Sequence, residues 1–107
     1  MRRLDLDAQE RRFRSRLAQL AHQTWLIRGS LNERRQKCGK PNCRCAKGEL
    51  HPCLYLVQSH EGKVRQIFVP KHWEARVRQA VTDYQEMQRL IEDISELEWD
   101  RLRARKD

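Results

Sequence analysis

A cluster of four cysteines and one histidine within 16 residues constrains this chain more than any other feature of its sequence. The cluster runs from Cys38 to Cys53 with the spacing Cys-x4-Cys-x-Cys-x5-His-x-Cys, in which the histidine is His51. The same stretch contains two of the three prolines and two of the four glycines, and these residues disfavour regular helices and strands. We therefore expect irregular backbone here, held in shape by a bound ligand.

The donor atoms of this segment favour zinc as that ligand. A structural zinc ion takes four sulfur or nitrogen ligands in a tetrahedron. The chain shows no secretory signal, so we expect a cytoplasmic protein, in which closely spaced cysteines indicate metal binding rather than disulfides. We predict one structural Zn2+ ion bound by Cys38, Cys43, Cys45 and His51, with Cys53 as the substitute if His51 turns away.

Other interpretations of the cysteines stay open at this stage. An iron–sulfur cluster of the plant ferredoxin type uses Cys-x4-Cys-x2-Cys, and the spacing here is one residue shorter. A redox-active pair usually has the spacing Cys-x-x-Cys, which this chain lacks. The cysteines could also be unconnected buried or free thiols. Zinc fits the donor set best.

The net charge of +8 lies entirely in the first half of the chain. Residues 1–50 contain 13 Lys and Arg against 5 Asp and Glu, whereas residues 51–107 contain 10 of each kind. This density suits contact with phosphate, so we predict binding to nucleic acid, with DNA as the expected form. The predicted contact residues are Arg28, Arg34, Arg35, Lys37, Lys40, Arg44 and Lys47.

The spacing of apolar residues predicts a single α+β domain that is mainly helical. Apolar residues recur at helical spacing over residues 4–28 and again over residues 73–94. We expect a first helix over 1–29, a basic zinc-binding segment over 30–53, a β-hairpin over 54–70 and a long final helix over 71–107. The two helices are predicted to pair as an antiparallel stalk, with a zinc-knuckle loop and the hairpin as its head.

Three local signals refine this scheme. Gly29 is expected to stop the first helix. Residues 30–33 (Ser-Leu-Asn-Glu) match a helix capping box, but Leu31, Glu33 and Arg35 would alternate equally well on a strand, and the sequence does not separate the two. The hairpin is expected to turn at Glu61-Gly62 and to end at Pro70.

The cysteine segment resembles an uncharacterised bacterial and archaeal family of small proteins marked by Cys-Gly-Lys-Pro-Asn-Cys-Arg-Cys. The resemblance extends over residues 27–31, 38–45, His51, 54–56, 62–63 and 69–70. That family usually has His-Gly-Pro where this chain has His-Pro-Cys at residues 51–53. The resemblance therefore favours His51 over Cys53 as the shared ligand. It implies no known activity, and a frequent location near mobile-element genes implies a link to nucleic acid.

These observations predict a non-catalytic protein. The sequence contains no nucleophile elbow, no phosphate-binding loop and no His-Glu-x-x-His motif. We expect a zinc-containing, nucleic-acid-binding accessory to a larger complex, such as a mobile-element or defence machine. The alternative is a protein adaptor that docks a partner through its helical seam, with zinc purely structural. The final helix could also form a homodimer, and no stretch is apolar enough to predict a membrane span.

Overall fold

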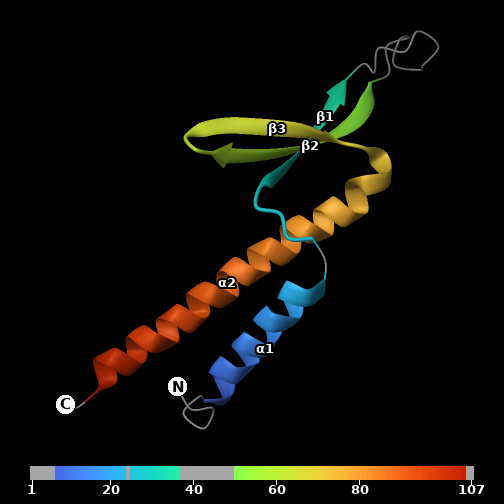
Figure 1. Cartoon of the computed structure of the whole chain (residues 1–107). Coiled ribbons are helices and arrows are strands. Elements are labelled where there is room, and N and C mark those ends of the chain that lie inside the picture. The colour runs from blue at the N-terminus through green and yellow to red at the C-terminus, as the bar shows by residue number, and fades with distance from the viewer. Residues whose placement is uncertain (1–6, 24, 37–49, 106–107) are drawn as a thin grey trace.

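The computed structural model describes residues 7–23, 25–36 and 50–105 as an elongated α+β fold with overall dimensions of 73 × 28 × 20 Å (Figure 1). The predicted fold class is confirmed as two helices and an antiparallel sheet, whereas the predicted zinc knuckle falls largely on residues 37–49, outside the described residues. The elements in chain order are α1 (Ala8–Gln23), β1 (Ser30–Gln36), β2 (His51–His60), β3 (Lys63–Val69), the short 3-10 helix η3 (Lys71–Trp73) and α2 (Glu74–Ala104).

The two helices form the predicted antiparallel stalk. Arg16 of α1 pairs with Glu86 near the middle of α2, while Glu10, earlier in α1, pairs with Arg101 near the end of α2. This reversed order shows that the helices run in opposite directions, as Figure 1 shows. Leu20 of α1 is fully buried. The start of α1 and the end of α2 therefore share one tip of the molecule, far from the sheet.

Helix α1 begins with a side-chain cap and ends earlier than expected. The Glu10 backbone N–H donates to Asp7 Oδ1 at 2.7 Å, which satisfies one of the N–H groups left free at a helix start. The helix ends at Gln23, so the prediction that Gly29 stops it is wrong. The chain is instead drawn onto other elements: the Ile27 backbone N–H donates to the carbonyl oxygen of Ala80 on α2 at 3.3 Å.

Gly29 allows a close backbone approach. A Cβ atom at this position would lie 2.9 Å from the carbonyl oxygen of Val57 and 2.9 Å from Leu56 Cδ1. Backbone oxygens cannot move aside as a flexible side chain can, so a side chain here would push the start of β1 away from β2. Glycine thus sets the entry of the chain into the sheet.

Three strands form one antiparallel sheet in the order β1-β2-β3. Residues 30–36 adopt the strand rather than the capped helix, because β1 pairs along its whole length with β2. Ser30 lies opposite Val57 and Gln36 opposite His51. The strand thus depends on a partner some twenty residues further along the chain.

The hairpin of β2 and β3 confirms the predicted turn. Glu61 and Gly62 have φ angles of 51° and 79°, and two consecutive positive values are typical of the two-residue turn that matches strand twist. Strand β2 begins at His51, three residues before the predicted start of the hairpin, so it includes the last part of the predicted zinc-binding segment. Pro70 follows β3 and precedes the helical turn of η3, as expected.

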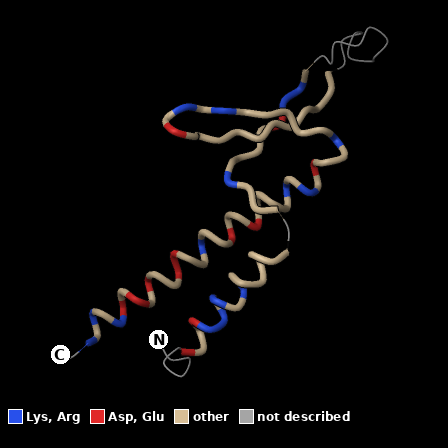
Figure 2. Tube along the Cα trace, in the orientation of Figure 1, with Lys and Arg blue, Asp and Glu red and all other residues tan. Residues whose placement is uncertain are grey.

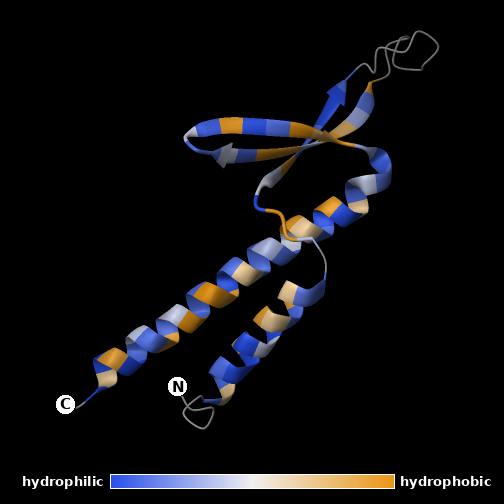
Figure 3. Ribbon diagram, viewed as in Figure 1, coloured by the Kyte–Doolittle hydropathy of each residue, from blue (hydrophilic) through white to orange (hydrophobic). Residues whose placement is uncertain are grey.

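One face of the sheet packs on the first turns of α2. Leu54 and Val69 of the sheet form a buried cluster with Val77 and Val81 of α2, and Ile27, Leu31 and Leu56 pack around it. Figure 3 shows hydrophobic residues recurring along α2 both below the sheet and beside α1. Within the described residues, no helix is both long and apolar enough to span a bilayer.

Candidate nucleic-acid interface

The predicted zinc segment is attached to the sheet at the end of the β1–β2 ladder. Strand β1 ends at Gln36, and its pairing partner His51 begins β2. The predicted ligands Cys38, Cys43 and Cys45 lie outside the described residues. Among residues 7–23, 25–36 and 50–105, no group of three or more potential metal ligands occurs. The structure therefore describes one favoured ligand, His51, and the substitute, Cys53.

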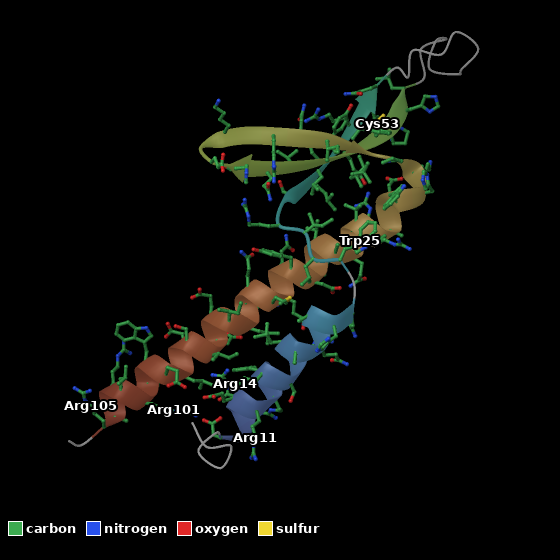
Figure 4. All side chains as sticks on the ribbon, viewed as in Figure 1. Arg11, Arg14, Trp25, Cys53, Arg101 and Arg105 are labelled. Carbon is green, nitrogen blue, oxygen red and sulfur yellow. The ribbon has the colours of Figure 1, made fainter. Side chains whose placement is uncertain are left out.

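His51 and Cys53 lie on the same face of β2, since alternate residues of a strand share a face. Both are half-buried, and the Cys53 thiol contacts the carbonyl oxygen of His51 at 3.8 Å. Figure 4 labels Cys53 near the beginning of β2. Imidazole nitrogen and thiolate sulfur are both zinc donors, so the chemistry of this pair fits the predicted ion.

The face of the sheet that carries His51 and Cys53 is opposite to the face packed on α2. We name it the open face and define it by Arg34 and Gln36 of β1, Cys53 and Tyr55 of β2, and Gln66 and Phe68 of β3. Figure 1 shows both helices lying to the other side of the sheet. No described helix or strand covers this face.

Two aromatic side chains meet on the open face. Tyr55 and Phe68 are cross-strand partners, with ring centroids 5.8 Å apart in an edge-to-face arrangement. The Tyr55 hydroxyl donates to Gln36 Oε1 at 3.1 Å, which holds the ring across β1. Phe68 is 50% exposed. The aromatic pair is therefore accessible on the surface and does not belong to the core below the sheet.

Arg34 lies across all three strands of the open face. Its guanidinium carbon is 4.2 Å from the centre of the Tyr55 ring, and its Nη2 donates to Gln66 Oε1 at 2.5 Å. Both partners are electrically neutral. The arginine is thus held in one orientation while its positive charge has no carboxylate beside it among the described residues.

The other predicted contact residues are more scattered. Arg28 precedes β1 and donates through Nη2 to the carbonyl oxygen of Ser59 at 2.8 Å. Arg35 is exposed on β1, on the opposite face from Arg34 because strand residues alternate. Lys37, Lys40, Arg44 and Lys47 lie outside the described residues. Among the described residues, Arg28, Arg34 and Arg35 lie at or beside β1, and Arg34 and Arg35 project to opposite faces of the sheet.

Two residues of β3, Gln66 on the open face and Arg65 on the opposite face, contribute to the surface of the sheet but are absent from the sequence prediction. Gln66 positions Arg34, and Arg65 is held by Gln58, whose Oε1 accepts from the Arg65 Nε at 2.7 Å. The β-prone run at residues 64–69 predicts a strand but not which of its side chains share a face with those of β2. That signal becomes useful only once the register of β3 against β2 is known.

Several arginines of the stalk contact carboxylates, whereas Arg28, Arg34 and Arg65 of the head contact neutral groups; Arg76 of α2 is an exception, because it lies over the Trp25 ring at 4.8 Å. We define the head as residues 25–36 and 50–70, and the stalk as α1 and α2. In the stalk, Arg14 pairs with Glu10, Arg16 with Glu86, Arg101 with Glu10, Glu98 and Asp7, and Arg103 with Asp100. In the head, Arg28, Arg34 and Arg65 are held by neutral groups.

The sequence reinforces this contrast. Residues 25–70 contain nine Lys and Arg against three acids, whereas residues 82–100 contain seven acids and one arginine. Figure 2 shows acidic residues recurring along the half of α2 that lies beside α1. A polyanion would therefore be attracted to the head and repelled by that part of the stalk.

The shifted pKa values lie in the stalk. A hydrogen bond from Arg14 holds the pKa of Glu10 below its ordinary value. A hydrogen bond from Arg16 likewise lowers the pKa of Glu86, and the same contact raises the pKa of Arg16. These shifts favour the charged forms and identify a structural ion-pair network between the helices.

Comparison with known proteins places this architecture in a family. Residues 3–79 match the family described as "Domain of unknown function (DUF6788)", and the match includes α1, all three strands and the first turns of α2. The chain belongs to this family. Searches of curated proteins and of solved structures found no match.

Proposed function

We propose that this protein is a non-catalytic accessory factor that binds nucleic acid, with DNA as the expected form, through its basic head. One observation carries the proposal: the head arginines Arg28, Arg34 and Arg65 are held by neutral groups, whereas the stalk arginines Arg14, Arg16 and Arg101 are paired with carboxylates. A charge that is oriented but not neutralised is available to phosphate at a small entropic cost. The expected wider context is a larger complex, such as a mobile-element or defence machine.

The proposal includes one structural Zn2+ ion bound by Cys38, Cys43, Cys45 and His51. His51 lies opposite Gln36 at the end of the β1–β2 ladder, and Cys38 follows Gln36 by two residues in the sequence. The donor set of three thiolates and one imidazole suits zinc. Such an ion would fix the direction in which Lys40, Arg44 and Lys47 leave the sheet. Their charges would then add to those of the ordered head arginines.

The proposal is tested by comparing two charge reversals that change the net charge equally. The head variant carries Arg28→Glu and Arg65→Glu, and the stalk variant carries Arg11→Glu and Arg12→Glu. Fluorescence anisotropy with a labelled oligonucleotide should show the head variant losing roughly 10- to 100-fold in affinity at low salt, since each phosphate contact contributes to a steep salt dependence. The stalk variant should stay within about twofold of the wild type.

Zinc content and melting temperature are measured on both variants. They show whether the head variant has kept its fold. Equal losses for the two variants would mean that binding follows net charge alone, and the head would no longer be the interface. A wild-type protein that binds neither DNA nor RNA at low salt would refute the proposed function itself.

The second candidate function is a protein adaptor that docks a partner through the stalk. It is favoured by Ile91, Trp99 and Leu102 of α2, which are 51%, 55% and 58% exposed. Large exposed apolar side chains on one helix suit a partner protein or a second copy of this chain. Sedimentation of the wild type and of Trp99→Glu would reveal a homodimer through α2. This activity could coexist with nucleic-acid binding at the head.

A further inference from the structure

The open face has a composition that phosphate binding alone does not require. A surface that contacts only phosphate needs cations, but this one also presents an exposed Phe68 ring beside Tyr55. Exposed aromatic rings on an uncovered antiparallel sheet are the means by which several nucleic-acid-binding folds stack unpaired bases. The cost of leaving Phe68 in water suggests a ligand with an apolar, flat surface.

We propose that the open face binds single-stranded nucleic acid by stacking bases on Phe68 and on the Arg34–Tyr55 pair. This inference rests on the proposed function and specifies its ligand and its site. The Phe68 ring offers a stacking surface directly. The guanidinium carbon of Arg34 lies 4.2 Å from the centre of the Tyr55 ring, so the planar guanidinium adds a second flat group beside the aromatic pair.

Arg34 also supplies the contact to the backbone of the strand. Its Nη2 donates a hydrogen bond to Gln66, and a guanidinium has five N–H donors in all. The remaining donors can reach phosphate oxygens without loss of the stacked geometry. One ordered side chain thus joins base stacking to phosphate binding.

The shape and charge of the molecule favour a single strand over a duplex. Bases in a duplex are stacked on one another and cannot lie flat on a sheet, whereas unpaired bases can. The acidic part of α2 at residues 82–100 repels phosphate, so the strand should cross the sheet and should not follow the stalk. On the open face, two aromatic rings lie beside a cation that no described carboxylate neutralises.

A groove on the other side of the hairpin provides a competing site and a matched control. It encloses about 360 Å³ between the hairpin and the segment before β1, and its lining includes Ile27, Leu56 and Ile67. Ile67 is 64% exposed and adjacent to Phe68 on β3, but it projects to the opposite face. Substitution of Ile67 thus removes a similar exposed apolar side chain from the same strand without touching the open face.

The test measures affinity for labelled oligothymidylate about 12 nucleotides long, a length within the usual site size of such proteins. Phe68→Ala should weaken binding about 5- to 100-fold, the range expected for loss of one stacked base. Ile67→Ala should leave the affinity within about twofold. Arg34→Lys keeps the positive charge but removes the planar guanidinium. It should therefore weaken binding, whereas charge attraction alone predicts no change.

Three probes separate stacking from simple charge attraction. An abasic oligonucleotide of the same length keeps the phosphates without the bases, and it should bind the wild type and Phe68→Ala equally. A blunt duplex should also be insensitive to Phe68→Ala. An oligouridylate keeps unpaired bases on an RNA backbone, so Phe68→Ala should weaken its binding as it weakens binding of oligothymidylate.

Melting temperature and zinc content confirm that each variant is folded. Wild-type binding that is unchanged by both Phe68→Ala and Arg34→Lys would overturn the inference but leave the proposed function intact. A loss with Ile67→Ala and none with Phe68→Ala would move the site to the groove and also overturn it. Absence of binding by the wild type to every probe would refute the proposed function together with the inference.

Discussion

Head and stalk both contain arginines, but the arginines have different partners in the two regions. In the stalk, Arg16 and Arg101 of opposite helices form ion pairs such as Arg16–Glu86 across the helix interface, so their charge stabilises the fold. In the head, Arg34 is placed over Tyr55 and against Gln66, which orient it without neutralising it. The partner of an arginine, rather than its presence in the sequence, therefore separates structural from interacting charge.

The largest effect is expected from removing a predicted zinc ligand, because it should damage only the head. Cys43→Ser should reduce zinc from about one ion per chain to nearly none, since zinc binding and local folding are coupled. The helical circular dichroism signal should persist, because α1 and α2 have their own contacts at Leu20 and at the Arg16–Glu86 pair. Elemental analysis and circular dichroism measure the two quantities.

Two further variants identify the fourth ligand. Cys53→Ser should keep the metal, and His51→Ala should lose it. The reverse outcome would replace His51 with Cys53 in the site. Undiminished zinc in Cys43→Ser would remove Cys43 from the ligand set.

Gly29→Ala is expected to lower the free energy of unfolding by about 1–3 kcal/mol, the usual cost of overpacking. The added Cβ would meet the Val57 carbonyl oxygen at 2.9 Å, and that oxygen belongs to the sheet backbone. Chemical denaturation measures the change, with Ser30→Ala as a neighbouring control expected within about 0.5 kcal/mol. Equal unfolding free energies for Gly29→Ala and the wild type would show that the backbone at the start of β1 can shift to accommodate the added Cβ.

Acid should weaken the stalk through Glu10 and Glu86. Their pKa values are lowered in the folded protein, so their stabilisation is present above the unfolded pKa of about 4.3 and is lost as pH falls through the folded value. Glu10→Gln removes one of these carboxylates. The melting temperature of that variant should fall less than that of the wild type between pH 7 and pH 3.

The difference between the wild-type and Glu10→Gln curves of melting temperature against pH measures the contribution of Glu10 to the stalk. The comparison is needed because zinc ligands also take up protons in acid and would affect both proteins. Figure 4 shows Arg14 and Arg101 at the tip where this network lies. Parallel curves for the two proteins would mean that the buried Glu10 does not contribute to acid sensitivity.

The smallest effect is expected at the ion pair that joins stalk to head. Arg78 of α2 contacts Glu33 of β1 at 2.5 Å, but the side chains are 46% and 67% exposed. Such exposed pairs contribute about 0–1 kcal/mol, so Arg78→Met should change the unfolding free energy by no more than this. A larger loss, sensitive to salt, would make this pair a true link between the two regions.

The sequence predicts best where the signal is local. The Glu61-Gly62 turn, the end of β3 at Pro70 and the long final helix follow from residue types within a few positions. The extent of α1 was not predictable in the same way. Apolar residues continue through Ile27 at helical spacing, but the hydrogen bond from Ile27 to Ala80 draws that segment out of the helix.

Strand β1 and the open face needed information from distant parts of the chain. Residues 30–33 fit a helix cap and a strand equally well, and pairing with β2 decides between them. The alternation of Leu54, Tyr55 and Leu56 predicts two faces of a strand. Only the packing of Leu54 against Val77 of α2 shows which face is buried and leaves Tyr55 on the other.

Helices α1 and α2 bring the two described ends of the chain together, with Arg101 3.6 Å from Asp7. Anything attached at either end would hold the sheet on a spacer, since the 31 residues of α2 extend about 46 Å. A fluorophore or affinity tag placed there would lie far from the open face and leave it accessible. A partner protein attached at that end would likewise hold the head at a distance set by the length of the stalk.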